Sequence, residues 1–171
     1  MPSPPPDSAA QHGTLVLGCR FDVPPARLYA AISDPLERAL VGTLGDAQIR
    51  LLDESDFRVG GRDFFRFGLK GAPAFRAEAI FHRIVPQALI VSTEIVHTGE
   101  TCVSVELVSL TLAGRGDATH LKLTTQFLSL GADEDLADAA SSRHQALLDA
   151  LTRHLGTPPR DRGRAFSRRR R

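Results

Sequence analysis

The chain is poor in the residue types that most often mark reactive or metal-binding sites. It has no tryptophan, one tyrosine, one methionine and two cysteines among 171 residues. Neither Cys19 nor Cys102 has a Cys or His neighbour at metal-ligand spacing. The sequence therefore favours two reduced thiols buried in strands over a zinc site or a disulfide framework.

Long hydrophobic runs and targeting signals are missing as well. No apolar stretch approaches the roughly 18 residues that read as a membrane-spanning helix. Residues 1–7 contain neither a basic cluster nor the apolar centre of a secretory signal. These absences predict a cytoplasmic protein with no membrane span.

Catalytic motifs are equally scarce. The sequence contains no nucleophile elbow, no His-Glu-x-x-His pair and no phosphate-cradling glycine loop. Its histidines are scattered over separate predicted strands, apart from the last helix. We therefore predict no catalytic set, no metal site and no cofactor.

Charge divides the chain into two parts. Residues 156–171 hold seven Arg and one Asp, whereas residues 1–155 hold 14 Lys+Arg against 19 Asp+Glu. We predict a folded domain over residues 13–156, between a disordered tail at 1–12 and a basic disordered tail at 157–171. An arginine run can also contact nucleic acid or anionic lipid, but the acidic body predicts no nucleic-acid binding.

Hydrophobic periodicity predicts many strands and one long helix. Pro24-Pro25 starts a short helix, and Ser33-Asp34-Pro35 ends it and starts a second one. Apolar residues recur at helical spacing from Leu136 to Leu155, and Gly156 follows. Antiparallel strands are predicted over 14–23, 48–59 (interrupted near 53–56), 62–69, 75–85, 89–97, 102–112 and 119–130.

Five motifs in this order resemble the START-like (SRPBCC) superfamily, and within it the bacterial relatives of the activator of heat shock protein 90 ATPase. They are Phe-Asp-x-Pro-Pro-x-Arg-Leu-Tyr-x-Ala at 21–31, Asp34-Pro35, Arg-Val-Gly-Gly at 58–61, Ile-Val-Pro-x-x-Leu at 84–89, and Thr-x-Leu-x-Leu-Thr at 119–124. The resemblance implies an α+β helix-grip fold. In that fold a curved antiparallel sheet of six to seven strands surrounds a long C-terminal helix and leaves a cavity.

Three departures from the family pattern fall on positions that the resemblance places in the pocket or core. Relatives carry a Trp around Ala39–Val41, where this chain has none, and Gly-Trp where it has Arg143-His144. Relatives often have an acidic residue near Arg83. The resemblance therefore implies a pocket of different shape.

His144 is the first candidate for a polar group in that pocket. Its spacing from Leu148 places it on the helix face toward the sheet. Three roles are open there: a core histidine bonded to a strand hydroxyl or carbonyl, a ligand contact, or a proton-transfer group. Outer-face ion pairs are predicted for Glu94, Glu106, Arg66, Arg76 and Glu78. The predicted cavity wall comprises His144, Phe65, Phe67, Phe81, Val91, Thr93, Ile95, Val105, Leu123 and Leu148.

The resemblance implies three functions. The first is binding of a hydrophobic or amphipathic small molecule or lipid, without catalysis. The second is a protein-interaction module that activates a chaperone ATPase, and the third is an enzyme of the polyketide cyclase or aromatase kind.

Overall fold

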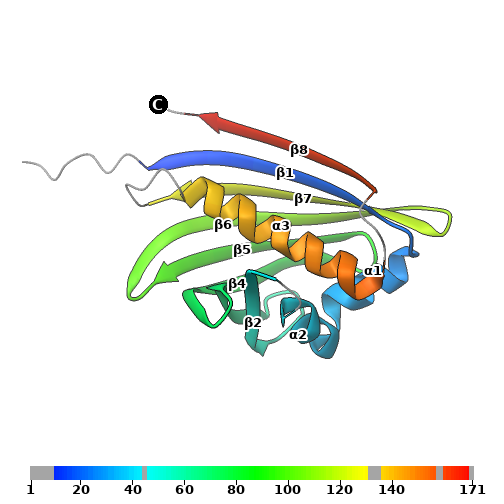
Figure 1. The fold of residues 1–171 in the computed structure, drawn as a ribbon, viewed down its shortest axis with the longest axis horizontal. Coiled ribbons are helices and arrows are strands. Elements are labelled where there is room, and N and C mark those ends of the chain that lie inside the picture. Colours follow the sequence, from blue (N-terminus) through cyan, green and yellow to red (C-terminus); the bar gives the residue numbers. More distant parts are fainter. Residues whose placement is uncertain (1–9, 44–45, 131–135, 157–159, 170–171) are drawn as a thin grey trace, which may run out of the picture.

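A curved antiparallel sheet and three helices make up the fold (Figure 1). The computed structural model describes residues 10–43, 46–130, 136–156 and 160–169. The strands lie in the order β2-β3-β4-β5-β6-β7-β1-β8. In chain order the elements are β1 (Gln11–Phe21), α1 (Pro25–Ser33), α2 (Pro35–Thr43), β2 (Gln48–Ser55), β3 (Arg62–Leu69), β4 (Ala72–Val85), β5 (Leu89–Thr98), β6 (Thr101–Arg115), β7 (Ala118–Ser129), α3 (Leu136–Leu155) and β8 (Arg160–Arg169).

This arrangement confirms the helix-grip prediction. Seven strands follow one another as predicted, two short helices follow β1, and α3 runs across the concave face of the sheet (Figure 1). The backbone of α3 lies close to α2, β1 and β2. The sheet therefore curls so that two distant strands approach the same helix.

Proline and aspartate set the two short helices. Pro25 occupies the first turn of α1, where a missing amide hydrogen leaves no hydrogen bond unmade. Asp34 then ends α1, and its carboxylate accepts hydrogen bonds from the amides of Leu36 and Glu37 at 2.9 and 3.0 Å. This cap starts α2 directly, which keeps α1 and α2 in contact.

The glycine pair lies in the loop between β2 and β3. Gly60 has a φ of 79°, which L side chains rarely adopt, and a Cβ on Gly61 would lie 2.1 Å from the carbonyl oxygen of Asp56. The strand predicted to reach Val59 ends at Ser55. The pair therefore serves the loop backbone, as glycine's conformational freedom allows.

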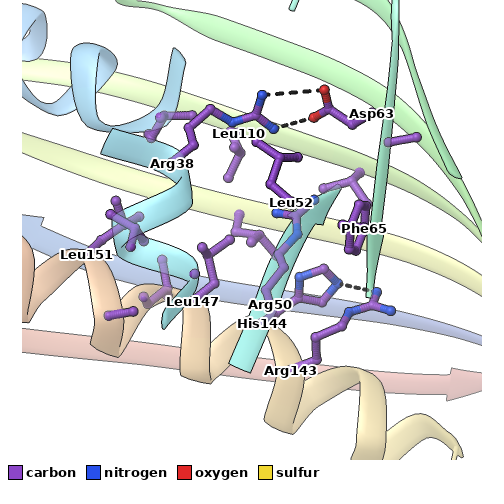
Figure 2. A pocket seen from close by; sticks show the side chains of 18 of the residues that line it. Arg38, Arg50, Leu52, Asp63, Phe65, Leu110, Arg143, His144, Leu147 and Leu151 are labelled. Atoms are coloured by element: carbon purple, nitrogen blue, oxygen red, sulfur yellow. Dashed lines mark hydrogen bonds and ion pairs between the residues drawn. The ribbon is translucent and has the colours of Figure 1, made fainter. Parts of the chain in front are cut away.

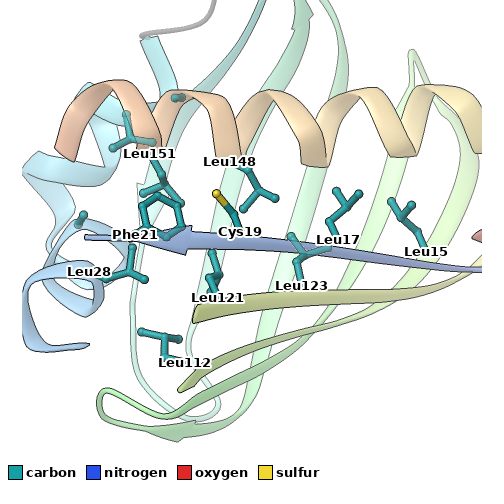
Figure 3. Close-up of a cluster of buried hydrophobic side chains, with 13 residues drawn as sticks. Leu15, Leu17, Cys19, Phe21, Leu28, Leu112, Leu121, Leu123, Leu148 and Leu151 are labelled. Atoms are coloured by element: carbon teal, nitrogen blue, oxygen red, sulfur yellow. The ribbon is translucent and has the colours of Figure 1, made fainter. Parts of the chain in front are cut away.

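The main core lies between α3 and the β1–β7 half of the sheet (Figure 3). Leu15, Leu17, Cys19 and Phe21 share one face of β1, as the period of two predicts, and each is at most 1 % exposed. They pack with Leu121 and Leu123 of β7 and with Leu148 and Leu151 of α3. Full burial of each such side chain contributes about 1.5–3 kcal/mol, which fixes the helix over this half.

The two ends of the chain differ from the sequence prediction. β1 begins at Gln11, inside the segment predicted to be disordered, and residues 1–9 lie outside the described residues. Residues 160–169 form β8, antiparallel to β1, where a disordered tail was predicted. Backbone hydrogen bonding to an open strand edge does not depend on side-chain hydrophobicity, so the arginine-rich composition concealed this strand.

None of the described helices combines the length and apolarity that a membrane crossing needs.

Candidate ligand-binding site

A cavity of about 110 Å³ lies between α3, α2 and the concave face of the sheet (Figure 2). Small side chains leave this space, among them Ala79 of β4, Ser92 of β5 and Ala146 of α3. Apolar side chains form most of the wall. The polar ones are Arg38, Gln48, Arg50, Asp63, Ser92, Glu94, Arg143 and His144.

Arg143 and His144 project from α3 into a buried polar cluster. Arg143 forms an ion pair with Glu106 of β6, and its Nη2 also lies 3.1 Å from Nε2 of His144. Nε2 lies 3.3 Å from the carboxylate of Glu106 as well. A guanidinium can only donate and a carboxylate can only accept, so the role of Nε2 in these two contacts depends on the tautomer of the ring. The hydroxyl of Thr125, which can donate or accept, lies 3.1 Å from the same nitrogen. Arg143 and His144 are therefore both tied to strands of the sheet.

Burial and neighbouring charges set the protonation of this cluster. Burial lowers the pKa of His144, and the positive charge of Arg143 lowers it further, although Glu106 acts in the opposite direction. Burial alone would raise the pKa of Glu106, but Arg143 and His144 hold that pKa at about 2. The cluster at neutral pH therefore contains a neutral imidazole beside a carboxylate–guanidinium pair.

A second buried ion pair lies at the α2 side of the cavity. Arg38 of α2 pairs with Asp63 of β3 and donates to Ser55 Oγ at 2.7 Å (Figure 2). Ser55 in turn donates to Asp63 at 2.8 Å. Asp63 is fully buried, so these contacts compensate a carboxylate that would otherwise be costly to bury.

Arg50 reaches the cavity from β2, close to where that strand passes α2. A Cβ at Gly42 of α2 would lie 1.9 Å from the carbonyl oxygen of Arg50, so only glycine permits this approach. The Arg50 guanidinium carbon lies 3.7 Å from the ring centre of Phe65, a cation–π contact. Burial lowers the pKa of Arg50 to about 10, so it remains a cation at neutral pH.

The predicted wall residues separate into two groups. Five line the cavity, namely His144, Phe65, Phe81, Leu123 and Leu148. Phe67 is buried beside it, with its ring 4.6 Å from the guanidinium carbon of Arg143.

The prediction is wrong for the wall residues of β5 and β6. Val91, Thr93 and Ile95 alternate with buried residues that face the cavity side, so they point to the other face of the sheet. Thr93 Oγ1 accordingly lies 2.7 Å from the exposed His82. Val105 is 37 % exposed, and it too lies outside the cavity wall.

The outer-face prediction is also wrong for two carboxylates. Glu94 and Glu106 are 6 % and 2 % exposed and point inward, because Arg143 from α3 compensates their charge. Arg66, Arg76 and Glu78 do form pairs on the outer face, with Asp53, Glu100 and Arg62.

Besides Glu94, four charged residues of the cavity wall were not predicted from the sequence, namely Arg38, Arg50, Asp63 and Arg143. For Arg143 a signal existed, since it occupies a family pocket position on the buried side of α3. For the others, alternation along a single strand or helix gives no sign of an opposite charge on a distant element.

Within the described residues no three His, Cys, Asp or Glu side chains gather as ligands. The arrangement instead combines apolar walls with a few fixed polar groups, which is how small-molecule pockets are usually built.

Solved structures share this fold. The chain is similar to the Mll3558 protein from Rhizobium loti, with 28 % identity over 85 % of this chain and 98 % of that one and a TM-score of 0.73. It is also similar to a protein from Rhizobium leguminosarum, with 26 % identity over 86 % and 96 % and a TM-score of 0.75. CalU16 from Micromonospora echinospora matches at 20 % identity over 83 % and 75 %, with a TM-score of 0.59.

No protein-family model matches the sequence, and no curated protein matches it either. What these comparisons establish is the fold: the chain has the helix-grip architecture of these bacterial proteins.

Proposed function

We propose that this protein is a START-like (SRPBCC) domain that binds a hydrophobic or amphipathic small molecule between the sheet and α3, without catalysing a reaction. The observation that carries the proposal is the 110 Å³ cavity, whose wall is mainly apolar and contains a few buried charged groups. Engineered apolar cavities of about 150 Å³ bind benzene. A cavity of this size suits a small ring or the end of a longer apolar chain.

The absence of chemistry follows from the state of His144. Arg143, Thr125 and Glu106 surround its Nε2 at 3.1 to 3.3 Å, so that nitrogen is already engaged by protein groups and not by a ligand. The ring then acts as a fixed part of the wall. A cyclase-like enzyme would instead need a titratable group facing its substrate.

Native mass spectrometry of freshly purified protein tests the proposal directly. We expect a mass excess that disappears on denaturation, and its value identifies the bound molecule. In the Ala79→Leu variant, which fills part of the cavity, the excess is expected to fall at least tenfold. Ala113→Leu places the same change on an exposed strand position and serves as the control.

Retained ligand in Ala79→Leu would contradict binding in this cavity. A clean mass for the wild-type protein, together with no binding of added small aromatic compounds, would contradict the proposal as a whole.

The chaperone hypothesis is separated by a different measurement. If the protein acts as an activator of a heat shock protein 90 ATPase, adding it must change that turnover. Unchanged turnover, together with a bound small molecule, leaves ligand binding as the function.

A further inference from the structure

The three cavity arginines differ in how well they are paired. Arg38 and Arg143 each have a carboxylate in direct contact and a further polar contact, Ser55 Oγ and His144 Nε2 respectively. For Arg50 the nearest carboxylate oxygen, on Glu94, is 3.9 Å away, beyond hydrogen-bond distance. Within the described part of the chain, Arg50 makes no side-chain hydrogen bond. Its donors are therefore available to the cavity.

Glu94 presents the complementary case. It is 6 % exposed and lines the same cavity, yet its oxygens lie 3.7 Å from Arg143 and 3.9 Å from Arg50. Among the described residues, the Glu94 side chain makes these two ion pairs and no hydrogen bond. A carboxylate that reaches the cavity space accepts strongly from a donor that enters it. The cavity therefore offers one unmet donor group and one unmet acceptor group side by side.

The stacking of Arg50 on Phe65 limits where its donors point. The guanidinium carbon lies 3.7 Å from the ring centre, so one face of the group is covered by an apolar surface. Figure 2 shows Arg50 beside Phe65 and His144 in this part of the pocket. Only the edge of the guanidinium remains for hydrogen bonding, which favours a ligand group approaching in a defined direction.

Charge in this part of the cavity is balanced. Arg50 and Arg143 face Glu94 and Glu106, and the Arg38–Asp63 pair is balanced by itself. A ligand with a net charge would add an uncompensated charge in a poorly solvated place. A neutral group that both accepts and donates would meet Arg50 and Glu94 at no such cost.

We propose that Arg50 and Glu94 together recognise a neutral polar head that carries an acceptor next to a donor, as a primary amide does, on a small apolar body. The carbonyl oxygen would accept from Arg50 and the N–H would donate to Glu94. This inference deepens the proposed ligand binding and depends on it, because it assigns the chemical class of the ligand's head.

Four aromatic probes of similar size test the head group. Benzamide, benzoate, benzylamine and toluene differ in that head, which at pH 7 is neutral and polar, anionic, cationic and apolar respectively. Each is titrated into the full-length protein and followed by two-dimensional NMR. We expect benzamide to bind roughly tenfold more tightly than the other three, from two added hydrogen bonds.

Two substitutions make the test specific to charge balance. Glu94→Gln leaves a surplus positive charge, so benzoate is expected to become the tightest of the four probes. Arg50→Met leaves a surplus negative charge, so benzylamine is expected to take that place. Glu78→Gln, which removes an outer-face carboxylate paired with Arg62, leaves the wild-type order unchanged.

The outcomes separate this inference from the proposed function. A wild-type protein that prefers benzoate, or that binds toluene as tightly as benzamide, overturns the head-group assignment while small-molecule binding stands. An unchanged probe order in folded Glu94→Gln also overturns it. No binding of any probe to the wild type contradicts both, and the wild-type ranking decides the matter even where a variant fails to fold.

Discussion

The two halves of the concave face bury different kinds of side chain, apolar in one half and charged in the other. Along α3, β1 and β7 present leucine and phenylalanine side chains that are almost fully buried (Figure 3). Further along the sheet, β3, β5 and β6 bury Asp63, Glu94 and Glu106, opposite arginines from the helices. The first half holds the helix in place, and the second contributes the charged groups that line the cavity.

Breaking the buried pair of the charged half has the largest expected effect. Arg143→Met leaves Glu106 buried with its main counter-charge removed, and such changes cost about 3–5 kcal/mol of unfolding free energy. Urea denaturation measures this loss. Arg76→Met, which removes an exposed pair with Glu100, is the matched control and is expected to have almost no effect.

The double variant Arg143→Met with Glu106→Gln distinguishes the effect of charge from the effect of packing. It removes both charges, so it is expected to recover at least half of the loss. A double variant as unstable as the single one would show that Arg143 stabilises the fold through packing on Phe67 instead of through charge.

The packed half is tested by truncating one side chain in each half. Leu17→Ala, in the dense core, is expected to cost about 3–5 kcal/mol, because the vacated space has contact on every side. Ile90→Ala is expected to cost nearer to about 2 kcal/mol, because Ile90 already borders the cavity. If the two variants lost equal stability in thermal and urea unfolding, the proposed difference in packing would be contradicted.

Acid is expected to act on the charged half and not on the apolar side chains of the packed half. The pKa of His144 is lowered by folding, so its contribution is complete above pH 6.5 and falls as pH drops below that value. The pKa of Glu106 is lowered from 4.5 to about 2, so its contribution falls between those values. Stability should therefore decline in two successive steps as the pH falls.

His144→Gln isolates the first step. Glutamine can accept from Arg143 but does not titrate, so the decline just below pH 6.5 should shrink relative to wild type. His120→Gln, at an exposed position, should retain the wild-type decline in stability. Urea midpoints measured between pH 7.5 and 4.5 decide this, and a wild-type decline preserved in His144→Gln would contradict the assignment.

The smallest effect is expected on the outer face of the sheet. Arg66 contacts both carboxylate oxygens of Asp53, but both side chains are more than a third exposed. Arg66→Ala should therefore lower the urea midpoint only slightly, and high salt should remove even that small effect. A loss as large as that of Arg143→Met would remove the distinction between inner and outer pairs.

The sequence predicts the elements well because their boundaries carry strong local signals. Pro24-Pro25, Asp34-Pro35 and Gly156 act on their own backbone, and the period of two places the apolar face of β1 correctly. β5 shows the limit of this reasoning. Its more apolar set, with Val91 and Ile95, faces outward.

The inward set of β5 contains Ser92 and Glu94 because Arg143, far away in sequence, supplies the opposite charge. A rule that places hydrophobic side chains inside selects the wrong face at such a site. The prediction failed where charge is buried, and the proposed recognition of a ligand head group depends on those same buried charges.

The pairing of β8 with β1 has a consequence for circular permutation of the chain. His12 lies opposite Arg169, so the first and last described strands end side by side, while the turn after Arg115 lies at the far end of β7. A short linker between the two ends would make β8 and β1 an ordinary hairpin. New ends could then open at Gly99, between β5 and β6, and every strand would keep its present neighbours. The packing of the sheet on α3 would then depend on which strands are neighbours in space and not on their order along the chain.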